Sequence, residues 1–160
     1  WMETVKAAGR ELRLTVEITE RLLFDDPAEA HKALNDLAAS GIGISIDDFG
    51  TGNASLIHLT RFPVGIIKID RSFTRAIGCG RVEEALIETI LVMAKRLDLR
   101  VVAEGVETRE QYEYLRERNC DFVQGYFLGR PVSAVEFLEM ARETGTPRAD
   151  GRSMRGGAAP

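Results

Sequence analysis

The chain has 160 residues, of which 44% are hydrophobic and 29% are charged, and its formal net charge at pH 7 is −4. These values indicate one globular domain of ordinary size and composition. They argue against a protein that coats a nucleic-acid polymer, because lysine and arginine do not outnumber the acidic residues and the phosphates would stay unneutralised. A compact anionic ligand is compatible with this charge if metal ions bridge it to acidic side chains.

The sequence has no apolar run close to the roughly 20 residues that a membrane-spanning helix needs. Its two cysteines, Cys79 and Cys120, have the spacing of neither a metal site nor a disulfide framework, which indicates reduced thiols. We therefore expect a cytoplasmic domain. Because the chain opens on Trp1 and not on methionine, we also expect an excised segment of a longer protein, whose upstream part could carry a membrane anchor.

Five segments of apolar alternation or short apolar runs predict strands, and a helix is predicted after each of them. The strands are expected at 12–19, 42–48, 64–70, 100–106 and 120–129. The helices are expected at 26–41, around 54–61, at 81–99, from 108 and from 133. Residues 144–160 have no apolar periodicity, and we expect them to form a disordered tail or linker.

Residue types mark several of these helix ends. Pro27 suits a first helical position and Gly41 a helix stop. The segments 108–111 ("TREQ") and 133–136 ("SAVE") have the capping-box pattern. Strands that alternate with helices predict an α/β fold with a parallel sheet covered by helices. Five units form either an open five-stranded sheet or the last five-eighths of a (β/α)8 barrel, which has eight strands in about 250 residues.

Each of the five predicted strands ends in polar or charged residues. In chain order these are Glu17, Asp47 with Asp48, Lys68, Glu104 and Gln124. The carboxyl ends of parallel strands meet at one mouth, where four carboxylates repel one another unless cations intervene. Carboxylates without a histidine or cysteine ligand suit Mg²⁺ or Mn²⁺. Two such ions, about 3.5–4 Å apart, would activate a water and stabilise the leaving oxygen in phosphodiester cleavage.

Each of these residues has a plainer interpretation when it is taken alone. Glu17 and Glu104 could be solvated charges at strand ends, and Asp47 a turn or helix-cap aspartate. Lys68 differs from them, because a lysine on an apolar strand needs a partner. Only the occurrence of all these residues together at the strand ends favours a metal site over a set of solvated surface charges.

Five motifs carry a resemblance to a known family. They are "VEITE" at 16–20, "DDFGTG" at 47–52, "KIDRSF" at 68–73, "VVAEGVET" at 101–108 and "VQGYFLGRP" at 123–131. In this order and spacing the chain resembles the EAL domain family from about residue 12 to residue 141. The resemblance implies a TIM-barrel-like fold and the hydrolysis of cyclic di-GMP, a bacterial messenger, with two Mg²⁺ or Mn²⁺ ions.

Carried over motif by motif, the resemblance implies a role for each polar strand-end residue. The ligands of the metal pair would be Glu17, Asp47, Asp48 and Glu104. Lys68 would orient the attacking water, Glu104 would hold metal or activate that water, and Gln124 would hydrogen-bond beside Glu104.

The loop after the Asp pair resembles the family's mobile loop, which couples metal binding to dimer formation. Its residues here include Gly50, Thr51, Gly52, Asn53 and Ser55. Glu20 resembles the residue that anchors this loop, and Asn53 stands where tyrosine is usual. Arg71 and Glu107 are further candidates for contact with the substrate.

The family's signature Glu-Ala-Leu strand, and an asparagine ligand one strand later, are expected upstream of residue 12. The tripeptide at Glu84 to Leu86 is a different one, because it lies inside the helix predicted at 81–99, where Ala85 and Leu86 continue an apolar stripe. The chain would thus hold the last five β/α units of a truncated barrel in residues 1–143, with a tail at 144–160.

The resemblance implies a parent cyclic di-GMP phosphodiesterase that forms linear pGpG, while this fragment alone is expected to be inactive. The parent is expected to form a homodimer and to carry an upstream sensor or cyclase-like domain. The alternative is a catalytically inactive EAL-like receptor for cyclic di-GMP, or a protein-interaction module.

Overall fold

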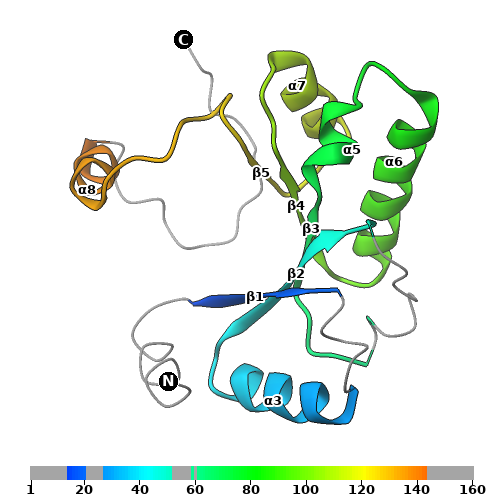
Figure 1. Cartoon of the computed structure of the whole chain (residues 1–160), viewed down its shortest axis with the longest axis vertical. Helices are drawn as coiled ribbons and strands as arrows, with labels where there is room; N and C mark the ends of the chain where they lie inside the picture. The colour runs from blue at the N-terminus through cyan, green and yellow to red at the C-terminus, as the bar shows by residue number, and fades with distance from the viewer. Residues whose placement is uncertain (1–13, 21–26, 52–58, 60, 144–160) are drawn as a thin grey trace.

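A computed structural model describes residues 14–20, 27–51, 59 and 61–143 (Figure 1). In this part of the chain five parallel strands form one sheet in the order β1-β2-β3-β4-β5. The strands are β1 Thr15–Thr19, β2 Gly43–Phe49, β3 Ile66–Ile69, β4 Arg100–Glu104 and β5 Phe122–Gln124. The helices are α3 Pro27–Ala39, α5 Arg71–Arg75, α6 Arg81–Arg96, α7 Arg109–Glu117 and α8 Ala134–Glu143. The predicted α/β class with a parallel sheet is confirmed.

Two predicted segments lie wholly or mostly outside the described residues. They are the helix around 54–61 and the tail at 144–160. The strand predicted at 120–129 is too long, because β5 ends at Gln124, where the chain turns. The short helix α5 was not predicted. It begins after Asp70, whose carboxylate accepts a hydrogen bond of 2.9 Å from the backbone N–H of Ser72.

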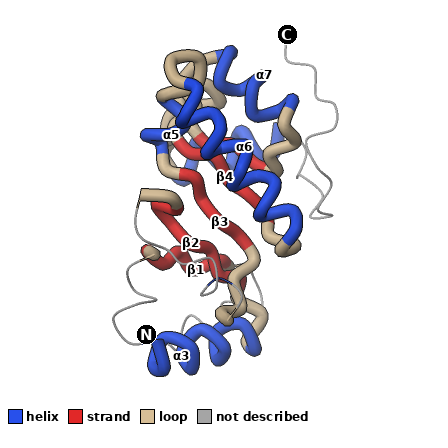
Figure 2. The backbone as a smooth tube through the Cα atoms, turned by 90° about the vertical axis from the view of Figure 1, so that its right-hand side faces the viewer, coloured by secondary structure: helices blue, strands red, loops and turns tan. Residues whose placement is uncertain are grey.

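One face of the sheet is covered by helices. Figures 1 and 2 show α3 beside the end formed by β1 and β2, and α5, α6 and α7 beside β3 and β4. Ile46, Ile67 and Ile69 lie on this face with 0% of their surface exposed. They share one buried cluster with Ile87 of α6 and Leu115 of α7. The burial of these large side chains provides most of the driving force for folding.

The opposite face of the sheet carries the polar residues, because successive side chains along a strand alternate between faces. Glu17, Ser45 and Lys68 lie there on three successive strands. Phe122 of β5 is 43% exposed on it. Helix α8 lies apart from the sheet (Figure 1), and its side chains from 134 to 140 are all exposed.

Two further properties bear on the environment of the chain. No helix in the described ranges combines the length and the apolar content that crossing a membrane requires. Both cysteines carry free thiols, with Cys79 exposed and Cys120 buried. Burial raises the pKa of Cys120 to about 12, so this thiol stays protonated and unreactive near neutral pH.

The capping box predicted at 108–111 is confirmed. The Thr108 hydroxyl accepts from the backbone N–H of Gln111 at 3.3 Å, and the Gln111 side chain accepts from the backbone N–H of Thr108 at 3.1 Å. The Ser133 and Glu136 pair makes the same reciprocal bonds at the start of α8. Both helix starts could therefore be located from residue type alone.

Replacement of the cap, Thr108→Ala, is expected to lower the free energy of unfolding by about 1 kcal/mol. The alanine leaves one N–H of the first turn of α7 without its acceptor, and α7 is coupled to the core through the buried Leu115. Urea denaturation would measure the loss. Thr108→Ser keeps the hydroxyl and should recover most of the stability. Equal losses in the two variants would contradict the capping role.

Candidate metal centre at the carboxyl ends of the strands

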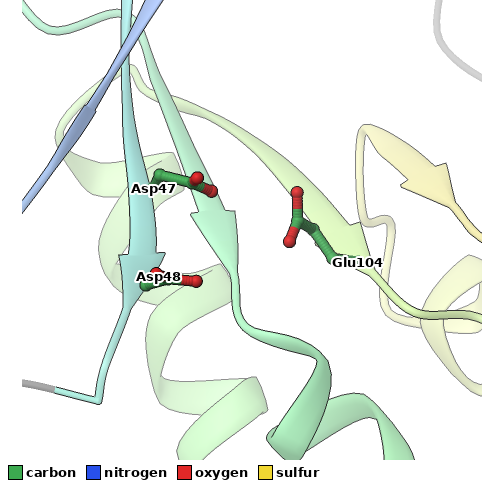
Figure 3. Close-up of side chains that lie close together, drawn as sticks. All are labelled: Asp47, Asp48 and Glu104. Atoms are coloured by element: carbon green, nitrogen blue, oxygen red, sulfur yellow. The ribbon is translucent and has the colours of Figure 1, made fainter.

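The Asp47–Asp48 pair owes its arrangement to an irregularity in β2. Side chains of consecutive strand residues normally point to opposite faces. Here the pairing of β2 with β3 shifts between Ile46 and Phe49, and Asp48 has a φ of 54°. Aspartate is one of the few residues that adopt this left-handed conformation readily. Both carboxylates therefore point toward the same side, as Figure 3 shows.

A third carboxylate, Glu104, reaches the pair from the end of β4. Figure 3 shows Glu104 pointing back toward Asp47 and Asp48 across β3. Each of the three offers one oxygen, and these oxygens lie within 4.8 Å of one another. Three of the four predicted metal ligands are thus brought together by the fold.

Lys68 lies at the centre of the carboxylates. Its Nζ is 2.8 Å from Glu17 Oε2, 3.0 Å from Asp47 Oδ1 and 2.6 Å from Glu104 Oε1. Only 7% of Lys68 is exposed. Burial alone would lower the pKa of Lys68, but its close ion pairs with Glu104, Glu17 and Asp47 more than offset this and raise the pKa well above its ordinary value. The prediction that this lysine needs a partner is confirmed, and the partners are three carboxylates.

The donor set fits a hard divalent cation. Every candidate ligand atom is a carboxylate oxygen, and neither cysteine nor histidine joins the described cluster. Asp47 Oδ1 is buried and, despite its distance of 3.0 Å from the lysine, has no hydrogen bond of good geometry. A buried anionic oxygen without such a bond is costly. A cation between Asp47, Asp48 and Glu104 would satisfy it.

Glu17 is placed differently from the prediction. It lies in the middle of β1, level with Ser45 of β2, and not at the end of the strand. The parallel register puts Thr19, two residues later, beside Asp47. Glu17 therefore lies one layer below the Asp pair. It meets the site through the long side chain of Lys68, while 52% of its own side chain is exposed.

The loop after the Asp pair is described only where it begins. Gly50 has a φ of 96°, and the Thr51 hydroxyl donates to the carbonyl of Asp48 at 2.9 Å. Gly52, Asn53 and Ser55 lie outside the described residues. Glu20 is 6% exposed, and in the described ranges neither of its carboxylate oxygens has a hydrogen-bond partner. Its role as an anchor for this loop stays a prediction.

A cavity of about 290 Å³ opens beside Glu104. Its lining residues are Arg71, Arg75, Glu104, Gly105, Glu107, Gln124, Gly125 and Tyr126. Gln124 lines it because the register of β4 and β5 pairs Gln124 with Glu104. Arg71 and Glu107, both predicted as substrate contacts, also lie here. The fold therefore places Gln124, Arg71 and Glu107 around one cavity that Glu104 of the carboxylate cluster also lines.

Sequence reasoning missed Arg75. Its guanidinium pairs with Glu107 at 3.2 Å and lines the same cavity. Arg71 and Arg75 are four residues apart on α5, a spacing that places both on one side of a helix. The spacing of the two arginines could have indicated this, but the helix itself was not predicted, because the five residues of α5 are too few to show helical periodicity.

Comparison with known proteins gives consistent matches. Probable cyclic di-GMP phosphodiesterase PdeN of Escherichia coli is 41% identical over 140 residues, which are 88% of this chain and 27% of PdeN. The bifunctional diguanylate cyclase/cyclic di-GMP phosphodiesterase MucR of Pseudomonas aeruginosa is 42% identical over 125 residues, 78% of this chain and 18% of MucR.

Solved structures match as well. The PaMucR phosphodiesterase in complex with c-di-GMP superposes with a TM-score of 0.74 and 41% identity, covering 78% of this chain and 50% of that one. BlrP1 of Klebsiella pneumoniae, solved with manganese and cyclic di-GMP, gives a TM-score of 0.72 and 34% identity, covering 81% and 33%. The chain thus spans half or less of the length of each of these four relatives.

The model of the EAL domain family matches residues 2–131, a range that includes all of the strands and the whole carboxylate cluster. This chain belongs to the EAL domain family.

Proposed function

We propose that this chain forms part of a cyclic di-GMP phosphodiesterase that opens the cyclic dinucleotide to linear pGpG with two Mg²⁺ or Mn²⁺ ions. The observation that carries the proposal is the cluster of Asp47, Asp48 and Glu104, whose oxygens lie within 4.8 Å of one another beside the buried Lys68. Residues 1–143 would hold the EAL part of the enzyme.

In this mechanism Asp47, Asp48 and Glu104 would hold the metal ions, and Glu17 would join them from the level of the sheet below. When bound, such ions make a coordinated water more acidic and neutralise charge on the phosphate. The raised pKa of Lys68 keeps its ammonium protonated, so Nζ can donate a hydrogen bond to the attacking water but cannot serve as a base. Gln124, the strand neighbour of Glu104, would fix the orientation of that carboxylate.

The cavity beside Glu104 would receive the part of the substrate nearest the reacting phosphate. Arg71 lines it without a carboxylate partner in the described ranges, which suits contact with an anionic oxygen. Glu107 is held by Arg75 at 3.2 Å and by the capping box of α7, since Gln111 accepts from the backbone N–H of Glu107 at 2.8 Å. This carboxylate is thus fixed in position at the edge of the cavity.

The alternative is a receptor that binds cyclic di-GMP without hydrolysing it. The close approach of three carboxylates favours the enzyme, because binding an anionic dinucleotide without metal would gain nothing from clustered negative charge. The absence of hydrolysis with tight binding retained would establish the receptor.

The test uses the chain extended upstream by about 90 residues, enough to complete a barrel of ordinary size. Cyclic di-GMP would be followed by chromatography with Mg²⁺, with Mn²⁺ and with chelator. Metal-dependent formation of pGpG is the expected result. Intact nucleotide in the presence of both metals would overturn the proposed activity.

We also propose that the domain forms a homodimer through α6. One side of this helix carries the exposed residues Val82, Leu86 and Val92, with 69%, 44% and 62% of their surface accessible. Leu86, predicted to continue the apolar stripe of this helix, lies on this exposed side. A Cβ added to Gly50 would lie 3.6 Å from Ile90 Cδ1, which puts the start of the loop after the Asp pair against α6. Dimer contacts there would bear on the metal centre.

The substitution Leu86→Glu is expected to shift the completed domain from dimer to monomer in light scattering, because it places a charge within an apolar contact. Val135→Glu, at a position 67% exposed on α8, makes the same chemical change elsewhere and should leave the mass unchanged. A dimer that survives Leu86→Glu would contradict this interface.

A further inference from the structure

Lys68 and a divalent cation would depend on two of the same carboxylates, those of Asp47 and Glu104. Nζ is 3.0 Å from Asp47 Oδ1 and 2.6 Å from Glu104 Oε1, and both residues also belong to the three-carboxylate cluster. A Mg²⁺ ion binds oxygen at about 2.0–2.1 Å in a demanding octahedral geometry. An ammonium group that already lies against these oxygens occupies part of the coordination space.

The charges of these groups also set the Lys68 ammonium in competition with a metal cation. In the described ranges Lys68 pairs with Glu17, Asp47 and Glu104, and Asp48 lies beside the last two, so one ammonium faces four carboxylates and the site keeps a surplus of negative charge that attracts cations. The ammonium nevertheless reduces that surplus and repels any dication that approaches. At the same time it holds three carboxylates together that would otherwise repel one another.

We propose that Lys68 is an internal counter-ion that competes with the divalent cation and thereby sets the metal affinity of the site. This inference rests on the proposed metal-dependent function. Lys68 assembles the carboxylates before metal binds, and it gives up part of its contact with Asp47 and Glu104 when metal arrives. Lys68 thus lowers the metal affinity of the site but keeps its carboxylates close together before metal binds.

A purely organising role for Lys68 makes the opposite prediction. If the ammonium only positioned the carboxylates, its removal would let them separate and metal would bind more weakly. If it competes, its removal increases the negative charge of the site and metal binds more tightly. The direction of the change in affinity therefore separates the two roles.

The experiment titrates the completed domain, the chain extended upstream by about 90 residues, with Mn²⁺ and measures free Mn²⁺ by electron paramagnetic resonance. Lys68→Met, which keeps the length of the side chain and removes its charge, should bind Mn²⁺ at least about tenfold more tightly than the wild type. Its melting temperature in chelator should fall, and Mn²⁺ should raise that temperature by more than in the wild type. Lys95→Met is the matched control, because Lys95 is an exposed lysine of α6 away from the cluster. It should bind Mn²⁺ as the wild type does.

Lys68→Arg keeps the charge and should not gain affinity. Unchanged or weaker binding by a folded Lys68→Met, beside measurable binding by the wild type, overturns the inference and leaves the proposed function standing. Absence of Mn²⁺ binding by wild type and variant alike overturns the metal site itself.

If Lys68→Met does not fold, the wild type supplies the answer. The ¹⁵Nζ resonance of Lys68 should shift during a Mg²⁺ titration as the ammonium loses contact with Asp47 and Glu104. A resonance that is unchanged at saturating Mg²⁺ overturns the competition.

Discussion

Asp47→Asn and Asp48→Asn are each expected to slow the formation of pGpG by the completed domain about a thousandfold. Each substitution removes one anionic ligand at nearly constant size, and a bound metal ion contributes several kcal/mol of transition-state stabilisation. Initial rates with Mg²⁺ and with Mn²⁺ would measure the loss. Asparagine also tolerates the φ of 54° at position 48, so the variant keeps the backbone that brings both side chains to one side.

The chain offers a matched control for Asp48. Asp98, after α6 at the opposite end of the sheet, has a φ of 57°. Asp98→Asn therefore makes the same chemical change in the same backbone conformation, away from the carboxylate cluster, and should leave the rate unchanged. Wild-type rates in folded Asp47→Asn or Asp48→Asn would remove the basis for the metal centre.

Much of this site could be predicted because its residues violate the rules for an apolar strand. Lys68 on a strand of isoleucines had to find a partner, and it has three. Glu104 and Gln124 were expected at neighbouring strand ends, and the register pairs them. These predictions depended only on the alternation of strand and helix, which fixes the end of the sheet where such side chains meet.

The features that could not be predicted depend on register and on local backbone conformation. Nothing in the sequence shows that Asp48 adopts a left-handed conformation, so the way in which two consecutive aspartates share one side stayed unexplained. Glu17 was expected at the end of its strand and lies in the middle of β1, opposite Ser45. The sequence pattern alone does not fix the stagger of β1 against β2. Leu86 was expected to continue the apolar stripe of α6, and its 44% exposure shows that this stripe is wider than the surface that the sheet covers.

Two glycines beside the cavity are further features whose role the sequence alone does not show. Gly105 follows Glu104 with a φ of 69°, and a Cβ added there would lie 2.5 Å from Arg71 Cβ. Gly125 follows Gln124, and a Cβ added there would overlap the backbone of Val106. Each glycine thus lets another segment approach directly after a predicted site residue. The sequence shows the glycines but not the segments that approach them.

Gly125→Ala is expected to lower the free energy of unfolding by about 3 kcal/mol, the largest loss of stability that we predict from a single methyl group. The Val106 N–H donates to the carbonyl of Gln124 at 3.0 Å, and the Val106 carbonyl accepts from the N–H of Phe127 at 3.0 Å. The added methyl group must push the two segments apart, which weakens both hydrogen bonds. Urea denaturation of the chain would measure the change, with the slope of the transition as a check on two-state behaviour.

Gly129→Ala is the matched control in the same segment, because a Cβ added at Gly129 would have nothing within 4 Å. Its free energy of unfolding should stay within about 0.5 kcal/mol of the wild type. Equal losses in the two variants would show that the segment tolerates no side chain for a reason other than contact with Val106. A loss confined to Gly125→Ala would instead show that the close approach of these two backbones stabilises the segment that follows Gln124. In that case the completed Gly125→Ala domain should also lose turnover, although the substitution removes no polar group from the site.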